Sequence, residues 1–169
     1  MRRKKNIVLI GMTGCGKSTV GRRLSYRLQM PFVDMDAWIE KKAGMSIPEI
    51  FEKEGEEGFR QRETETARRW GSERGTIIST GGGVVMREEN MKYLKKHAVV
   101  VYINRSVADI TKTLRMDKRP MLKGKADTLY PMYEKRHPLY KKYADIEVVN
   151  KGELKDGVNN VYKAVKDLI

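Results

Sequence analysis

The chain has 169 residues, of which 40% are hydrophobic and 34% charged, and its formal net charge is +13. That length suits one domain with a buried core, and the hydrophobic content excludes a disordered chain. No apolar stretch is long enough to span a bilayer, so no membrane partner is expected. The single cysteine, Cys15, cannot form an internal disulfide, which fits a reducing compartment. We predict one cytoplasmic domain over residues 1–169.

The positive charge could attract a phosphate backbone, but the sequence has neither zinc-finger spacing nor an RRM-like aromatic signature. Positive charge serves equally well to collect ATP and an anionic acceptor. We therefore expect no nucleic-acid partner. An NTPase stimulated by RNA or DNA stays an alternative.

Short apolar runs alternate with helical patterns along the chain. Strands are predicted at Asn6–Ile10, Pro31–Asp34, Thr76–Thr80, Ala98–Ile103 and Ile146–Val149. These runs are largely apolar and mostly β-branched, as in strands buried on both faces. The alternation predicts an α/β fold, a doubly wound parallel sheet of five strands that places ligands at the carboxyl ends of the strands.

Helices are predicted between these strands. Val20, Leu24 and Leu28 have helical spacing after the first strand, and capping boxes begin at Ser46 and Ser106. An apolar stripe predicts a last helix that includes Val158, Val161, Val165 and Leu168. The two histidines, His97 and His137, are interpreted as surface residues, because no His/Cys spacing indicates a metal site.

A glycine-rich segment joins the first strand to its helix. It reads Gly11-Met-Thr-Gly-Cys-Gly16-Lys17-Ser18 and satisfies the P-loop pattern G-x-x-x-x-G-K-S/T. Its backbone N–H groups can turn around phosphate oxygens, and the helix N-terminus adds its dipole. Lys17 is predicted to reach the β- and γ-phosphates and Ser18 to bind Mg²⁺. The predicted ATP-binding residues here are Gly14, Cys15, Gly16, Lys17, Ser18 and Thr19, with Cys15 interpreted as a small tolerated residue.

Two carboxylates, Asp34 and Asp36, follow the second predicted strand. Strand alternation would point both toward the ligand edge of the sheet. One could help to hold hydrated Mg²⁺ while the other accepts a hydrogen bond from an acceptor hydroxyl. The alternative is an N-cap for a helix over Ala37–Lys42. The sequence has no N-K-x-D motif for guanine, so the P-loop and this pair favour a small-molecule kinase over a GTPase.

From the second strand onward the sequence resembles the shikimate kinase family over nearly the full chain. The matching segments are Phe32-Val-Asp-Met-Asp-Ala-Trp-Ile-Glu40, Gly44-Met-Ser-Ile-Pro-Glu-Ile-Phe51, Gly55-Glu-Glu-Gly-Phe-Arg60-Gln-Arg-Glu63, Thr80-Gly81-Gly82-Gly83, Arg119-Pro120-Met-Leu122 and Tyr133-Glu-Lys-Arg136-His-Pro-Leu-Tyr140. In this order they are far more specific than the P-loop alone.

The resemblance implies an acceptor site. Asp36 would hold the hydroxyls of shikimate, and Arg60 and Arg136 would clamp its carboxylate with their planar guanidinium groups. Glu63 would orient Arg60. Gly81 and Gly82 would let the backbone approach the substrate closely. An acceptor-binding helical region would span about residues 35–63, and Asp34 would join Ser18 at the metal.

The resemblance also implies a mobile lid over the nucleotide, at about residues 112–125, where the sequence carries six basic residues and one acidic residue. Arg119 would contact the transferred phosphate and, with Lys17 and Asp36, would be catalytic. Arg115 would lie against the adenine. Many family members place a proline on the adenine after the last strand. Here residues 151–157 have none, and Asp156 stands at that position.

The predicted reaction is in-line transfer of the γ-phosphoryl group of ATP to the 3-hydroxyl of shikimate, with Mg²⁺ as cofactor and a monomer as the working unit. Asp36 would orient or deprotonate that hydroxyl. A kinase for gluconate or a nucleoside monophosphate is the nearest alternative, and a P-loop binding module without turnover is another.

Overall fold

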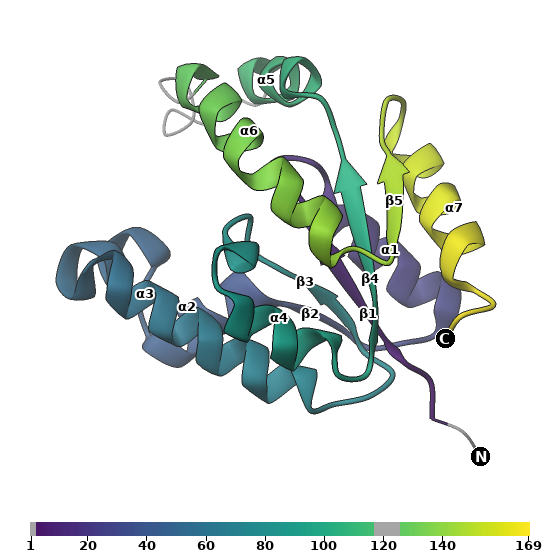
Figure 1. The fold of residues 1–169 in the computed structure, drawn as a ribbon, viewed down its shortest axis with the longest axis horizontal. Coiled ribbons are helices and arrows are strands. Elements are labelled where there is room, and N and C mark those ends of the chain that lie inside the picture. The colour runs from purple at the N-terminus through teal and green to yellow at the C-terminus, as the bar shows by residue number, and fades with distance from the viewer. Residues whose placement is uncertain (1–2, 117–125) are drawn as a thin grey trace.

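The computed structural model describes residues 3–116 and 126–169 (Figure 1). Its strands are β1 (Asn6–Ile10), β2 (Phe32–Asp34), β3 (Ile77–Ser79), β4 (Ala98–Asn104) and β5 (Ile146–Val149). Its helices are α1 (Lys17–Leu28), α2 (Met35–Ala43), α3 (Ile47–Gly71), the 3₁₀ turn η1 (Val84–Met86), α4 (Glu88–Lys95), α5 (Val107–Met116), α6 (Ala126–Tyr143) and α7 (Leu154–Val165). Every predicted strand is present, with ends that differ by one residue or none.

The strands form one parallel sheet in the order β2-β3-β1-β4-β5. Val8 of the central strand β1 pairs with Ile78 of β3 and with Val100 of β4. All five residues of β1 are buried, as an uninterrupted apolar strand requires when helices cover both faces of a sheet. The predicted fold class is therefore confirmed.

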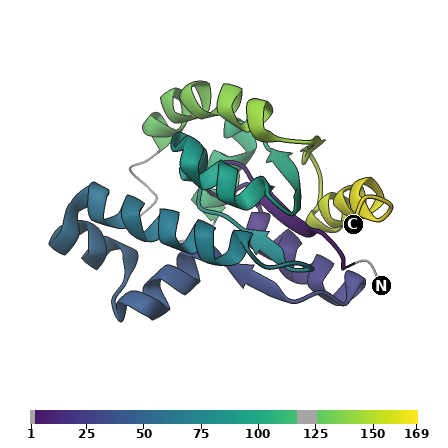
Figure 2. The same cartoon turned by 60° about the horizontal axis from the view of Figure 1, so that its bottom comes forward.

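Alternate residues of β1 face two separate cores. Val8 and Ile10 pack in a cluster that includes residues of α3, α4, α5 and α6, whereas Ile7 and Leu9 pack with residues of α1 and α7. Figures 1 and 2 show these two layers of helices on opposite sides of the sheet. This layering leaves the carboxyl edge of the central strands open to the loops that follow them.

Two helix boundaries differ from the sequence prediction. α2 begins at Met35, directly after β2, because Asp34 caps its first turn. α7 ends at Val165, so Leu168 lies outside the helix and is 48% exposed, and the predicted apolar stripe was wrong at that residue. The other three residues of the stripe are buried.

α3 begins with the predicted capping box. The Ser46 hydroxyl accepts from the backbone N–H of Glu49, and the Glu49 side chain accepts from the backbone of Ser46. Gly55 interrupts the helix with φ 73° and ψ 179°, so its two parts meet at a kink. α2 and the first part of α3 project beyond the β2 side of the sheet (Figure 2). They share a small core with the second part of α3, made by Ile39, Ile50 and Phe59.

The order of the strands decides where the sequence motifs meet. β1, β3 and β2 are neighbours, so the loops after their carboxyl ends lie side by side. These loops carry the P-loop at residues 11–16, the turn at residues 80–83 and the aspartates at 34 and 36. Among the described residues, no helix is long and apolar enough to cross a membrane.

Candidate active site

The P-loop connects β1 to α1 in the conformation that its glycines permit. Gly11 has φ 149°, and a Cβ there would lie 2.5 Å from the carbonyl oxygen of Ile103. Gly16, the N-cap of α1, has φ 97°, a value that side-chain-bearing residues rarely adopt. The first turn of α1 contains no acidic residue. Its N-terminus therefore keeps an uncompensated positive dipole end, which suits an anion.

Lys17 is buried at the start of α1. Its ammonium donates to the carbonyls of Gly11 at 2.6 Å and Met12 at 2.9 Å. Binding a phosphate would require Nζ to exchange these carbonyls for phosphate oxygens within the same loop. Cys15 is fully buried in the core that also holds Ile7 and Leu9.

The Ser18 hydroxyl donates to Oδ2 of Asp34 at 2.8 Å and lies 3.2 Å from the Ser79 hydroxyl. Oδ1 of Asp34 accepts from the backbone N–H groups of Asp36 at 3.0 Å and Ala37 at 3.3 Å. Asp34 is therefore the N-cap of α2, the alternative that the sequence left open. The prediction that strand alternation aligns the two aspartates was wrong, because β2 ends at Asp34 and Asp36 lies in the first helical turn.

Ser18 and Asp34 place one hydroxyl and one carboxylate together. Mg²⁺ in phosphate sites keeps several water ligands and takes only one or two protein oxygens, so these donors fit it. Within residues 3–116 and 126–169, no group of three or more His, Cys, Asp or Glu side chains could form an all-protein metal cage. The arrangement suits a cation that arrives with the phosphates.

Asp36 carries an unsatisfied carboxylate oxygen. Its Oδ1 is buried and has no hydrogen-bond partner in the described structure. Burial, followed by the charges of Asp34 and Glu63, raises the pKa of Asp36 to about 6, against a smaller lowering by Lys17. A buried oxygen without a donor is poised to accept a hydrogen bond from a ligand.

Glu63 is a second buried carboxylate, with 1% of its surface exposed. Its Oε1 accepts from Arg60 Nη1 at 2.8 Å, while Oε2 is buried without a hydrogen-bond partner in the described part of the chain. Burial raises the pKa of Glu63, and the nearby guanidinium groups of Arg60, Arg136 and Arg87 oppose that rise. The ion pair fixes the position of the Arg60 guanidinium.

The three glycines after β3 are the point where these side chains meet. A Cβ on Gly81 would lie 2.9 Å from Asp36 Oδ1 and 3.1 Å from Glu63 Oε2. A Cβ on Gly82 would lie 3.2 Å from the Arg136 guanidinium, and one on Gly83 would lie 2.6 Å from that of Arg60. The turn therefore gathers two carboxylates and two guanidinium groups from α2, α3 and α6, and glycine leaves room among them.

One cleft joins the P-loop to this turn. It encloses about 320 Å³ and is lined by Thr13, Gly14, Gly16, Lys17, Ser18, Thr19, Arg22, Asp34, Asp36, Thr80, Gly81 and Gly82. Lys17 and Asp36, whose Oδ1 is unsatisfied, thus line one space. A triphosphate and a hydroxylated, negatively charged acceptor could meet there.

Comparison with known proteins identifies the family. The shikimate kinase family model matches residues 13–166. A shikimate kinase of Clostridium beijerinckii is 40% identical over 164 residues, covering 97% of this chain and 96% of that protein. One from Actinobacillus succinogenes is 44% identical over 150 residues, 86% of each chain. The chain belongs to the shikimate kinase family.

The solved structures agree. The shikimate kinase of Acinetobacter baumannii in complex with shikimate has a TM-score of 0.88 and 36% identity, and the match covers 97% of this chain and 94% of that one. A gluconokinase of Sinorhizobium meliloti has a TM-score of 0.66 at 15% identity over 99% and 95% of the two chains, a likeness of fold alone. The family predicted from the motifs is confirmed.

The predicted shikimate kinase lid lies largely outside the described residues. Arg119 falls in the segment that the structure does not describe, and the side chain of Arg115 at the end of α5 is also outside the description. On the nucleotide side, the Asn150 amide donates to the Cys15 carbonyl at 3.4 Å, and Asp156 lies in the first turn of α7.

Sequence reasoning missed the contacts of two residues, Arg105 and His137. Arg105 donates to the Gly14 carbonyl at 3.1 Å and braces the P-loop from the loop after β4. His137 is not a plain surface residue, because it is partly buried, stacks on Tyr133 and bonds the Tyr102 hydroxyl at 2.8 Å. The hydrogen bonds of Arg105 and of His137 have no sequence signal, because each joins segments far apart in the chain.

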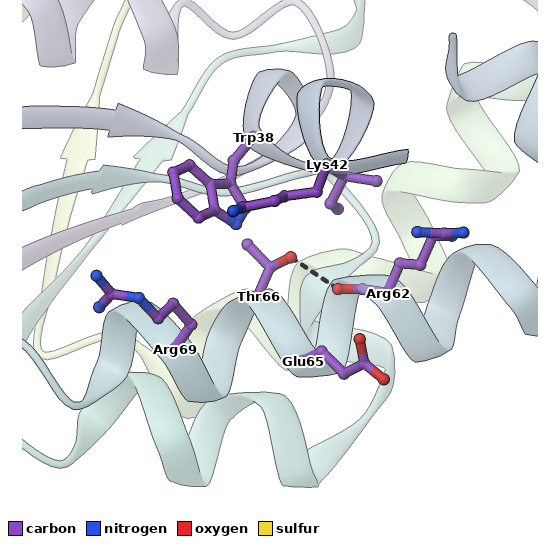
Figure 3. A pocket seen from close by; sticks show the side chains of 7 residues that line it. Trp38, Lys42, Arg62, Glu65, Thr66 and Arg69 are labelled. Atoms are coloured by element: carbon purple, nitrogen blue, oxygen red, sulfur yellow. Dashed lines mark hydrogen bonds between the residues drawn. The ribbon is translucent and has the colours of Figure 1, made fainter. Parts of the chain in front are cut away.

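A second hollow, of about 290 Å³, lies between α2 and α3. Its lining consists of Trp38, Ile39, Lys42, Arg62, Glu65, Thr66 and Arg69 (Figure 3). It shares no lining residue with the cleft. Arg62 is paired with Glu54 at 2.9 Å and Arg69 with Glu73 at 2.6 Å. Because this hollow is separate from the cleft that holds Lys17 and Asp36, we assign it no part in the reaction.

Proposed function

We propose that this member of the shikimate kinase family transfers the γ-phosphoryl group of ATP to the 3-hydroxyl of shikimate, giving shikimate 3-phosphate and ADP. The observation that carries the proposal is the cluster around Gly81–Gly83, where two unsatisfied carboxylate oxygens and two guanidinium groups lie beside the P-loop. Shikimate has hydroxyls for the first pair and a carboxylate for the second.

On the acceptor side, Arg60 and Arg136 bind the carboxylate of shikimate. Glu63 already holds Arg60 at 2.8 Å, so little side-chain freedom is lost when the substrate binds. Asp36 accepts the hydrogen bond of the reacting hydroxyl. With its pKa raised to about 6, Asp36 is mostly ionised at neutral pH and is a stronger proton acceptor than an ordinary aspartate. The hydroxyl is thereby oriented toward the P-loop for in-line attack.

On the nucleotide side, the N–H groups of the P-loop and the N-terminus of α1 receive the β- and γ-phosphates. Lys17 leaves the carbonyls of Gly11 and Met12 to neutralise charge on the transferred group. Ser18 and Asp34 would hold Mg²⁺, which would supply further positive charge beside the phosphates. Arg119 is proposed to add a second positive charge from the lid over about 112–125, with Arg115 against the adenine.

Other features stay predictions from the sequence. These are the single domain, the cytoplasmic location, the monomer and the lack of a nucleic-acid partner. Size-exclusion chromatography with light scattering tests the monomer. The lack of a nucleic-acid partner is tested by adding RNA or DNA, which should leave the rate of ATP hydrolysis unchanged.

The proposed function is tested by measuring ADP release with shikimate, quinate, gluconate and nucleoside monophosphates in parallel. Gluconate is essential in this panel because it also combines a carboxylate with hydroxyls. We expect strong stimulation by shikimate alone, and none in the Lys17→Met variant. Stimulation by a nucleoside monophosphate or gluconate, with none by shikimate, contradicts the proposal.

A further inference from the structure

Tyr140 is a fully buried tyrosine on α6 whose ring fills space behind the glycine turn. Its surface is 0% exposed, and its ring packs against Tyr102 of β4 with 5.0 Å between the ring centroids. A phenol buried this deeply needs a partner for its hydroxyl. The partner is the carbonyl oxygen of Gly82, to which the hydroxyl donates at 2.5 Å.

This hydrogen bond sets the conformation of the turn. The Gly81 carbonyl accepts from Val84 at 3.2 Å and the Gly83 carbonyl accepts from Met86 at 3.0 Å, so both lie within the 3₁₀ turn. The Gly82 carbonyl points instead to α6. Because a trans peptide is planar, the N–H of Gly83 points the opposite way, and Tyr140 fixes both directions.

Arg136 lies beside the peptide that Tyr140 holds. Residues 136 and 140 are one turn apart on α6, so their side chains lie on one face of the helix. A guanidinium nitrogen of Arg136 lies 3.2 Å from the Cβ position of Gly82, beside the peptide whose carbonyl accepts from Tyr140. Burial raises the pKa of Tyr140 well above its ordinary value, although Arg136 opposes that rise. The phenol therefore stays protonated at neutral pH and can donate to the carbonyl.

We propose that Tyr140 is a positioning residue for the acceptor, whose hydroxyl holds the Gly82 peptide, and with it the neighbouring Arg136 guanidinium, in the arrangement that receives the carboxylate of shikimate. The inference rests on the proposed function. It assigns Tyr140 to shikimate binding, because the hydroxyl donates to the Gly82 carbonyl and Gly82 lies beside Arg136.

The test compares Tyr140→Phe with Tyr102→Phe. Each change keeps a buried ring and removes one hydroxyl hydrogen bond, but the bond of Tyr102 goes to His137 at 2.8 Å and not to the turn. Releasing the carbonyl and the guanidinium should raise the KM for shikimate about 5- to 30-fold in Tyr140→Phe. The KM for ATP should change less than about twofold. Tyr102→Phe, with a similar loss in Tm, should leave both KM values near wild type.

A double-mutant cycle with Arg136→Lys adds a readout that a merely structural role would not move. If Tyr140 acts through Arg136, removing its hydroxyl should raise the KM for shikimate less in the Arg136→Lys background than in wild type.

Should Tyr140→Phe fold poorly, 4-aminophenylalanine at position 140 is the second variant, because it keeps a donor at the same ring position. It should bind shikimate within about threefold of wild type.

Several outcomes overturn the inference. They are an unchanged KM for shikimate in Tyr140→Phe, an equal rise for ATP, an equal rise in Tyr102→Phe, or additive effects in the cycle. Loss of shikimate binding in the 4-aminophenylalanine variant also overturns it. Wild-type turnover is measured in the same series. If shikimate stimulates no ADP release by the wild-type protein, the proposed function fails and the inference fails with it. If wild-type turnover is normal and the Tyr140→Phe variant is unaffected, the inference alone is overturned.

Discussion

Asp36→Asn should stabilise the protein while it lowers turnover. The carboxylate of Asp36 is held in a buried place beside Asp34 and Glu63, and its pKa is raised from 3.8 to about 6. The folded protein therefore binds a proton more tightly than the unfolded chain does, and the ionised side chain opposes folding at neutral pH. Asparagine has a similar shape and carries no charge.

The size of this gain follows from the shift in pKa. A difference of about two units corresponds to roughly 3 kcal/mol at pH 7, where both states are ionised. As the pH falls through 6, the folded carboxyl takes up a proton and the penalty shrinks, to about 1 kcal/mol near pH 4.5. We expect an observed gain of about 1–3 kcal/mol at pH 7, or a rise in Tm of roughly 3–10 °C.

Urea unfolding of both proteins at pH 7 and pH 4.5 measures the effect, and steady-state turnover at pH 7.5 is measured alongside. Turnover should fall about 10²- to 10⁴-fold. A variant that is less stable than wild type at pH 7 refutes the reasoning, as does a gain in stability that is larger at pH 4.5. A stabilised variant with normal turnover would show that Asp36 is buried for some other reason.

Three further predictions concern the two halves of the site. The kcat/KM for shikimate should fall about tenfold per pH unit below pH 6, and a flat profile from pH 5 to 8 contradicts this. Glu63→Gln should move this fall in kcat/KM to lower pH, because it removes a charge that raises the pKa of Asp36. Gly81→Ala should raise the KM for shikimate at least tenfold and spare ATP, because its Cβ would lie 2.9 Å from Asp36 Oδ1; equal effects on both substrates argue against the assigned subsite. Arg105→Ala, which frees the Gly14 carbonyl, should raise the KM for ATP about 2- to 10-fold; a change confined to shikimate would be the wrong result.

The fold was predictable because its signals are local. Each buried strand is a short apolar run, and the P-loop sequence dictates its own conformation at Gly11 and Gly16. The wrong predictions concern residues at which a helix cap or a helix end sets the boundary of an element. Asp34 ended β2 and started α2 within one residue, which no periodicity reveals, and the side chain did so by accepting two backbone N–H groups.

The candidate site was only partly predictable. The resemblance singled out Asp36, Arg60, Glu63 and Arg136, and the structure brings them together around one glycine turn. Tyr140 stood in a matching segment, but nothing in its sequence context indicates that its hydroxyl reaches a carbonyl 58 residues away. Such contacts depend on how α6 packs against β4 and the turn, which is a property of the tertiary structure.

The position of the transferred phosphate tests the central claim most directly. Wild-type protein is incubated with ATP, Mg²⁺ and shikimate, and the product is examined by ³¹P and ¹H NMR, with Lys17→Met as the blank. If Asp36 orients one hydroxyl while Arg60 and Arg136 hold the carboxylate, all of the new phosphate ester should be on the 3-hydroxyl. An ester on another hydroxyl, a mixture of esters, or ATP hydrolysed with shikimate unchanged would contradict that arrangement.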